Sequence, residues 1–244
     1  MSMTAERTVR ELALENTTAT RVFEKLGIDY CCGGNKSLGE ACQASNLSVD
    51  QVIDSLEMAE EAAHATQKDR NWQIEPLADL VVYIKNIHHK FTREEMARLA
   101  PLLDKVCLVH GKNHPELQQV RASFQGLVEE LTTHMMKEEG VLFPTIVRME
   151  EAVIQKEPLL PPPFGSLQNP VSMMEHEHDS AGNALRAMRE ASCGYTPPGD
   201  ACISYQTLYT ALADFEADLH QHIHLENNIL FPRAIEMERH ADLP

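Results

Sequence analysis

Apolar residues recur every three or four positions along most of the chain after Pro76, which predicts long amphipathic helices. Three turn-rich stretches interrupt this pattern: HGKNHPE, a Pro-rich stretch from Pro158 to Pro170, and the segment GYTPPG. Strand-like alternation is nearly absent. Four helices joined by two short connections and one longer one predict an all-α fold, with the helices packed as an up-down four-helix bundle.

The first part of the chain has a different pattern, which is typical of short helices. Ser37 with Glu40, and Ser48 with Gln51, have the Ser-x-x-Glu/Gln form of a capping box, which marks a helix start. A loop, IDYCCGGN, precedes the first box, and a polar run, AEEAAHATQKDRN, closes this part. We therefore expect two domains: a small helical domain over residues 1–71 and the bundle over residues 72–244.

Composition excludes several classes of protein. Lys and Arg total 21 against 37 Asp and Glu, and the formal charge of -16 would repel a nucleic-acid backbone. The amino terminus has no apolar signal region, and no stretch approaches the ~18 uncharged apolar residues of a membrane span. Six Cys are too few for a disulfide scaffold, so we expect a cytoplasmic protein with reduced thiols. The unusual feature is histidine, with 12 copies.

Two of these histidines belong to a repeat. HMMKEEGVLFP, residues 134–144, returns as HIHLENNILFP at residues 222–232, 88 positions later. In a helix, residues three and four apart share a face. The apolar stripe of the second helix therefore continues through His134 and Glu138, which could both bind a metal. Its members are Val120, Phe124, Leu127, Leu131, His134, Glu138 and Val141. The fourth helix has the same order: Leu208, Leu212, Phe215, Leu219, His222, Glu226 and Ile229.

The other two helices each contribute one inward histidine. On the third helix, His178 lies on the apolar stripe and His176 points away from it. The first helix carries the neighbours His88 and His89, and periodicity alone leaves both open. His89 is favoured because it lies on the same stripe as Thr92 and the apolar residues Met96, Leu99, Leu103 and Val106. His110 lies near this stripe, but about 30 Å further along a continuous helix.

Six inward residues, two of them acidic, predict a metal site. A single buried His is more often structural than a ligand. Burying several imidazoles and two carboxylates without a cation would cost several kcal/mol per ion or force protonation. Imidazoles with carboxylates favour iron or manganese over a structural tetrahedral zinc, and six ligands are too many for one closed zinc site. Two metal ions bridged by both Glu, with a solvent oxo or hydroxo bridge, fit the set: His89, His134, Glu138, His178, His222 and Glu226.

These residues resemble a known family. One inward His per helix, the doubled His-x-x-x-Glu with Leu-Phe-Pro, and the DYCCGG loop are similar to the iron-sulfur cluster repair di-iron proteins, the repair of iron centres family of bacteria. The resemblance covers nearly the whole chain and implies a hemerythrin-like bundle whose six residues above hold two non-haem iron ions. In that family's register, Arg93-Glu94-Glu95 supports His89 over His88. Oxygen-carrying hemerythrins use one more His, for which we expect no inward candidate here.

The resemblance also implies a function. It is the repair, in the cytoplasm, of iron-sulfur clusters damaged by nitric oxide or peroxide, through delivery of iron or through handling of nitric oxide. A nitric oxide reductase activity at the di-iron centre stays open. The expected partners are damaged iron-sulfur proteins and nitric oxide or oxygen, with no nucleic acid and no membrane; a homodimer stays open. The alternative is a hemerythrin-like sensor of iron, oxygen or nitric oxide. Two metals per chain make a poor iron store.

The Cys31-Cys32 pair has two interpretations. In the first, the helix start that follows would lower the thiol pKa and make the pair nucleophilic or metal-binding. In the second, the two residues are only part of a tight turn. The family's use of this loop favours a thiol role, such as passing iron or docking on the damaged partner. Cys42 follows in the next helix, close enough in sequence to lie near the pair.

The remaining cysteines and histidines carry no motif. We expect packing roles for Cys107, Cys193 and Cys202, and solvated side chains for four histidines: His110, His114, His220 and His224. Pro144 and Pro232 cannot donate to the carbonyls four residues earlier. The two ligand-bearing helices should therefore bend or end just past their ligands.

Overall fold

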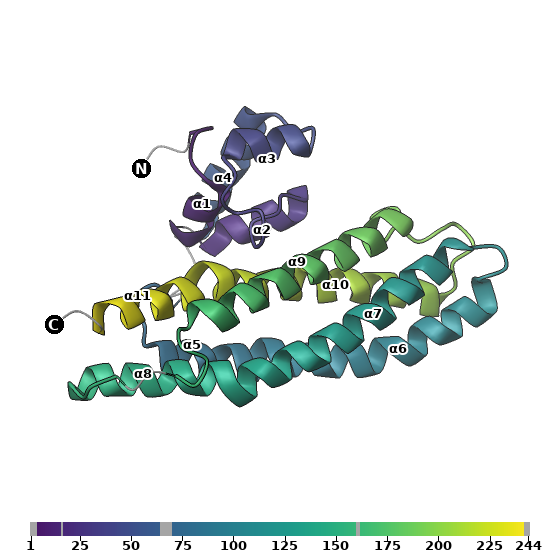
Figure 1. Cartoon of the computed structure of the whole chain (residues 1–244). Helices are drawn as coiled ribbons and strands as arrows, with labels where there is room; N and C mark the ends of the chain where they lie inside the picture. The colour runs from purple at the N-terminus through teal and green to yellow at the C-terminus, as the bar shows by residue number, and fades with distance from the viewer. Residues whose placement is uncertain (1–3, 16, 64–69, 160–161, 242–244) are drawn as a thin grey trace. The chain divides into compact units, whose positions relative to one another are not determined.

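The computed structural model describes residues 4–15, 17–63, 70–159 and 162–241 of the chain (Figure 1). They form two compact units: Met1–Pro76 with Ile223–Pro232, and Leu77–His222 with Arg233–Pro244. Residues 64–69 of the predicted polar run and residues 160–161 of the Pro-rich stretch lie outside the described residues.

The first unit contains four short helices around an apolar core. They are α1 (Val9–Glu15), α2 (Thr17–Leu26), α3 (Leu38–Ala44) and α4 (Val49–Ala63). Helix α2 packs against α1 and α4, and α3 packs against α4. The fully buried side chains Phe23, Leu38 and Leu56 form the centre of this core. Removal of such side chains from water is what holds a unit of this size together.

Helix α3 begins at the predicted capping box. The Ser37 hydroxyl accepts a hydrogen bond from the Glu40 amide at 3.2 Å, and the Glu40 carboxylate accepts one from the Ser37 amide at 2.9 Å. Both bonds satisfy amides that have no partner within a first helical turn. Helix α4 begins at Val49, directly after Ser48 as predicted.

Within this same unit, residues 223–232 bond to the DYCCGG loop. The Asn228 side-chain amide donates to the Tyr30 carbonyl at 3.1 Å, and Asn227 donates to the Cys31 carbonyl at 3.4 Å. Arg10 donates to the Asn228 carbonyl at 3.1 Å. The Tyr30 ring meets the edge of His224 at 5.5 Å. These contacts fix the backbone of the loop.

The chain after Pro76 forms helical runs that lie lengthwise beside one another (Figure 1). Among the described residues the chain after Pro76 has four such runs, as the sequence predicts. They are α5 (Leu77–Ile84), η1 (Lys85–His89) and α6 (Lys90–His110); α7 (Glu116–Lys137), η2 (Glu138–Leu142) and α8 (Phe143–Gln155); α9 (Gln168–Ala191); and α10 (Ile203–Leu225), η3 (Glu226–Leu230) and α11 (Phe231–Ala241).

The connections confirm a bundle of alternating direction. Helix α7 packs along α9 and along α6, and α5 packs against α8. His114, after α6, bonds to Asp200, before α10, at 2.9 Å. The first and third connections therefore lie at the same end of the bundle, as an up-down order requires. The predicted all-α, up-down four-helix bundle is confirmed.

Three short π-helical segments interrupt the α-helices, and each contains or begins at one of the predicted ligands. The amide of Phe143 donates to the carbonyl of Glu138, and that of Phe231 to the carbonyl of Glu226, both five residues earlier. The prolines after these phenylalanines have no amide to donate, and the wider turn accommodates them. The helices do not end at Pro144 or Pro232, but continue as α8 and α11.

The wider turn also shifts the apolar face by one residue. Val141, predicted to point inward, is 49% exposed, and Leu142 is buried in its place. Because a π turn holds one residue more than an α turn, the phase of the stripe changes at η2.

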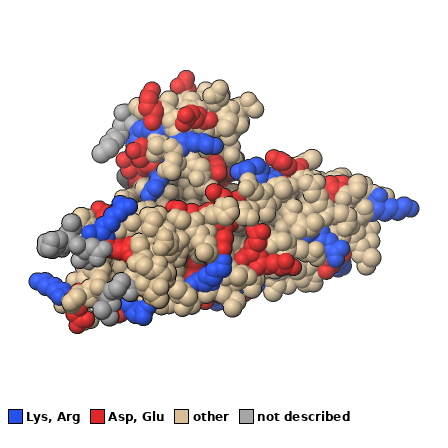
Figure 2. All heavy atoms as spheres, viewed as in Figure 1, with Lys and Arg blue, Asp and Glu red and all other residues tan. Residues whose placement is uncertain are grey.

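The surface carries both signs of charge. Acidic and basic side chains are interspersed over the face drawn in Figure 2. Within the described residues, no helix is both long enough and apolar enough to cross a membrane.

Candidate metal centre

All six predicted ligands are buried, and none exposes more than 2% of its surface. The structure brings them together in two clusters whose ligand atoms lie within 4.8 Å of one another. Two carboxylates, Glu138 and Glu226, belong to both clusters. One cluster adds the pair His89 and His222, and the other adds His134 and His178. Each half of the site therefore takes imidazoles from two different helical runs.

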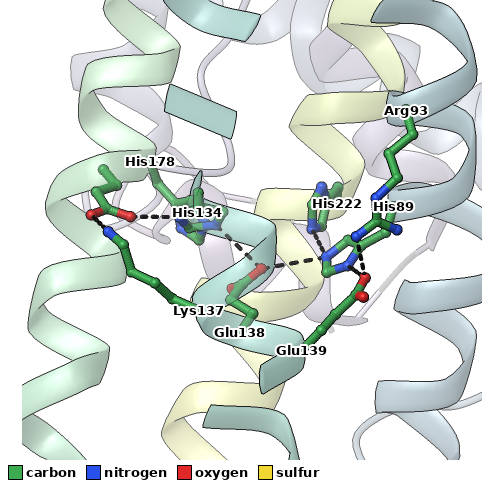
Figure 3. A network of polar contacts seen from close by, with 9 residues as sticks. His89, Arg93, His134, Lys137, Glu138, Glu139, His178 and His222 are labelled. Carbon is green, nitrogen blue, oxygen red and sulfur yellow. Dashed lines mark hydrogen bonds and ion pairs between the residues drawn. The ribbon is translucent and has the colours of Figure 1, made fainter. Parts of the chain in front are cut away.

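Glu138 lies between the two histidine pairs (Figure 3). One of its oxygens, Oε2, is 3.3 Å from Nε2 of His89 and 3.3 Å from Nε2 of His134. Within the pairs, Nε2 of His89 is 3.1 Å from Nε2 of His222, and Nε2 of His134 is 3.0 Å from Nε2 of His178. All four Nε2 atoms thus converge with the carboxylates on the interior of the bundle.

The other ring nitrogen of two histidines is held by an outer carboxylate. Nδ1 of His89 lies 2.7 Å from Glu139, which also accepts from Arg93 at 2.7 Å. Nδ1 of His134 lies 2.9 Å from Glu177, which also accepts from Lys137. A carboxylate at Nδ1 keeps the proton on that nitrogen and directs the lone pair of Nε2 inward.

The charges of these outer carboxylates are set by their partners. Burial acts to raise the pKa of Glu139, but the bonds from His89 and Arg93 outweigh it and lower that pKa. Burial likewise acts to raise the pKa of Glu177, but the hydrogen bonds from Lys137 and His134 outweigh it and lower that pKa. Both groups are therefore anionic at neutral pH and act as acceptors for imidazole N–H groups.

This donor set fits two metal ions. Inward imidazole nitrogens with outer carboxylates are the usual arrangement around a protein-bound metal. Carboxylates on two helices and imidazoles on all four match the sites that helical bundles build for paired ions. Nitrogen and oxygen donors without thiolate suit iron or manganese better than a structural zinc.

Two further histidines are buried besides the six predicted ligands. His88 exposes 3% of its surface, and its Nδ1 lies 3.0 Å from Asp218. The His88 ring stacks on His222 with the centroids 5.8 Å apart. His224, predicted to be solvated, also exposes 3% and lies 2.9 Å from the side-chain amide of Asn228. Burial, and next the charge of Arg10, lower the pKa of His224 to about 4.

Sequence reasoning also missed the outer carboxylates. Glu139 directly follows one predicted ligand, Glu138, and Glu177 directly precedes another, His178. An acidic residue next in sequence to a buried ligand was the available signal. It is a weak signal, because the helix rule places neighbours in sequence on different faces.

Cys31 departs from the predicted low pKa. The Cys31 thiol is buried, with its sulfur 3.8 Å from that of Cys32 and 3.5 Å from Asp29. The hydrogen bond with Cys32, followed by burial, raises the pKa of Cys31 well above its usual value. The two thiols and the Asp29 carboxylate lie within 4.8 Å of one another. Cys42 is buried in the core and is not part of this group.

The glycines of this loop have a steric role. A Cβ on Gly34 would lie 3.0 Å from the Tyr30 carbonyl oxygen and 3.1 Å from Cβ of Arg10. Both distances are shorter than ordinary contacts, so a side chain here would require the neighbouring atoms to shift where the loop passes helix α1. The Cys-Cys-Gly-Gly motif thus combines a thiol pair with a close backbone approach that favours glycine.

Of the remaining predictions for cysteine and histidine, several are wrong. Cys107 is buried as expected, but Cys193 and Cys202 are exposed. His114 is bonded to two carboxylates, Glu116 at 3.0 Å and Asp200 at 2.9 Å, and is not simply solvated.

Comparisons with known proteins agree with this architecture. The family model of the hemerythrin HHE cation binding domain matches residues 80–234, and the ScdA_N domain of unknown function matches residues 5–60. The iron-sulfur cluster repair protein YtfE of Pectobacterium carotovorum is 36% identical over 233 residues, which cover 96% of this chain and 98% of that protein. YtfE of Yersinia pseudotuberculosis is 36% identical over 228 residues, 93% of this chain and 96% of that protein.

Both domains, their order and nearly the full length are therefore shared with these relatives. The paired clusters lie within the matched cation-binding domain. The chain belongs to the YtfE-type family of iron-sulfur cluster repair proteins, with an ScdA_N domain followed by a hemerythrin HHE domain.

Proposed function

We propose that this protein repairs iron-sulfur clusters damaged by nitrosative or oxidative stress, and that two non-haem iron ions are its resident metals. The observation that carries the proposal is the pair of buried clusters sharing Glu138 and Glu226. The relatives named as iron-sulfur cluster repair proteins support the reaction. The nitrogen and oxygen donor set supports iron.

Each part of the chain has a task in this proposal. The six ligands are His89, His134, Glu138, His178, His222 and Glu226. When bound, the two irons supply redox chemistry and a coordination position for an incoming ligand. Glu139 and Glu177 hold the protons on Nδ1 of His89 and His134. Phe143, whose ring lies 5.6 Å from that of His89, covers one side of the site with apolar surface.

The partners follow from this function. They are proteins whose iron-sulfur clusters have been damaged, with nitric oxide or oxygen as small ligands of the iron. We place the protein in the cytoplasm, where such clients and reduced thiols occur together. The Cys31-Cys32 pair takes part in docking or in the passage of iron.

Reactivation of a damaged client tests the proposal. Protein loaded with two irons per chain is mixed without air with an iron-sulfur enzyme whose cluster has been destroyed by nitric oxide. Recovery of client activity with loss of iron from this protein is expected. Glu138→Gln removes the shared carboxylate, so it should bind well under one iron per chain and restore nothing. His176→Gln, an exposed residue on α9, is the matched control.

Two outcomes separate the possible roles of the iron. Release of nitrous oxide during anaerobic turnover with nitric oxide would assign the activity to nitric oxide reduction. Recovery of the client without nitrous oxide would assign it to iron delivery. If a fully loaded protein gives neither result, the repair function is wrong.

A second candidate, a sensor, is favoured by one observation. Asn227 and Asn228, next to Glu226 in sequence, bond to the Cys31 and Tyr30 carbonyls of the DYCCGG loop. A change at Glu226 could therefore be relayed to the loop. In a sensor, the binding of nitric oxide would change the hydrogen-exchange rates of the backbone amides in the loop. A sensor would also keep its two irons in the presence of a client.

A further inference from the structure

A second group of reactive side chains lies at the end of the bundle where α6 meets α7 and α9 meets α10. His110 is the last residue of α6, and Cys202 immediately precedes α10. Nε2 of His110 lies 3.2 Å from the sulfur of Cys202. The Cys202 thiol is exposed, so reagents in solvent can reach it. Neither residue belongs to the clusters that Glu138 joins.

The two helix ends have opposite effects on these groups. The carbonyl of Cys202 accepts the amides of Tyr205 and Gln206, both at 3.0 Å, so Cys202 is the N-cap residue of a 23-residue helix. The positive end of that helix favours a thiolate. His110 occupies the negative end of a 21-residue helix, which favours an imidazolium. Proton transfer from Cys202 to His110 thus places each charge at the helix end that stabilises it.

The surroundings hold the imidazole in place. The His110 ring lies 5.3 Å from the buried ring of Tyr205 and 6.3 Å from that of His114. Two carboxylates near this end, Glu116 and Asp200, would disfavour a thiolate, but both are bonded to His114. Burial acts to lower the pKa of His114, and these carboxylates outweigh it and raise that pKa. When protonated, His114 offsets one of these two negative charges.

We propose that His110 accepts the proton of the Cys202 thiol, and that Cys202 is the residue of this protein that reacts with peroxides and soft alkylating electrophiles. With a peroxide, the thiolate attacks one oxygen, an S–O bond forms and the O–O bond breaks. The leaving hydroxide takes the proton of His110. The products are a sulfenic acid, neutral imidazole and water, or an alcohol from an organic peroxide, so atoms and charge balance.

Cys193 provides a matched control within the same protein. It is also exposed, but it follows the carboxyl end of α9, where its amide donates to the Glu190 carbonyl at 3.2 Å. Helix carbonyls disfavour a thiolate. Among the described residues, no imidazole is bonded to Cys193. The two thiols therefore share exposure and differ in the features on which the proposal depends.

Competitive alkylation of the iron-loaded full-length protein tests this pair. Iodoacetamide is added at pH 7, and the modified fraction of each cysteine is followed in time by peptide mass spectrometry. Cys202 should react at least about threefold faster than Cys193, since His110 lies 3.2 Å away to accept the thiol proton and the start of α10 favours the thiolate.

Three variants complete the test. His110→Gln should slow alkylation of Cys202 at least about twofold, leave Cys193 unchanged and keep the iron content and melting temperature of the parent protein. Cys202→Ser should remove the fast adduct. After brief treatment with hydrogen peroxide, dimedone should label Cys202 more than Cys193, and His110→Gln should remove that preference. Equal rates at the two cysteines, or an unchanged Cys202 rate in His110→Gln, would overturn the proposal.

Discussion

The carboxylates outside the clusters determine which nitrogen of His89 and of His134 faces inward. Glu139 accepts from both His89 and Arg93, and its replacement by Gln removes the charge that holds the Nδ1 proton. Glu139→Gln should weaken iron binding about 10- to 100-fold, because outer partners of metal-bound histidines have effects of that size. Competition with a chelator, followed by iron counting, measures it. Glu94→Gln, an exposed change on α6, should keep the parent affinity, and equal affinities for both variants would contradict the role.

Side chains on regular stripes were predictable, and side chains covered by distant residues were not. His134, His178 and His222 lie on apolar stripes that local spacing reveals. His224 follows His222 by two positions, which places it on another face. It is buried because Tyr30 lies against it, from nearly two hundred positions earlier in the chain. Local periodicity carries no information on such a contact.

At the scale of the helices, the π-helical segment η2 decides which residues enter the core. Leu142 is 2% exposed, whereas its neighbour Val141 is 49% exposed. Leu142→Ala should lower the free energy of unfolding by about 2–5 kcal/mol, and Val141→Ala should change it by less than about 0.5 kcal/mol. Denaturant titration of the two variants measures this contrast. The reverse order of effects would show that the stripe passes through η2 without a shift.

A second prediction concerns the connections at the far end of the bundle. The folded state raises the pKa of His114 above its usual value, through Glu116 and Asp200 and against the effect of burial. A raised pKa stabilises the fold below about pH 6.5, and this stabilisation is lost as the pH rises through the folded-state pKa. The melting temperature of His114→Gln should therefore fall further below that of the parent protein at pH 6 than at pH 9. A difference independent of pH would contradict this, and His176→Gln should show no difference at either pH.

The elements themselves followed from the sequence, except for the π turns. Four helical runs, the capping box at Ser37 and the three connections agree with the spacing of apolar and turn residues. Pro144 and Pro232 marked where the regular hydrogen-bond ladder fails, but not whether the helix would end or widen. A π turn needs bonds to the residue five positions earlier, and no residue preference in these segments distinguishes it from an α turn. This is also why His88 and His89 could not be separated by periodicity.

For the whole molecule, the buried charge of the metal centre makes stability depend on the metal. Glu138 and Glu226 are fully buried, with four imidazoles around them. Removing the cations leaves these carboxylates in an interior that solvates them poorly, which costs several kcal/mol per uncompensated charge. Chelation should lower the melting temperature at neutral pH by several degrees, and readdition of ferrous iron without air should restore it. A melt unaffected by chelation would show that the clusters are stable without metal.

The π turns also divide the bundle at the level of the ligands. Three of the four helical runs gain one residue there, and α9 gains none. The apolar stripes on the two sides of the centre are therefore out of phase with each other along three runs and in phase along one. Each half has its own pattern of inward positions, and the pattern of one half does not predict that of the other. A chimera in which helices from a regular α-helical bundle replace those of this protein can keep the core intact only if the replaced segment ends before the ligands.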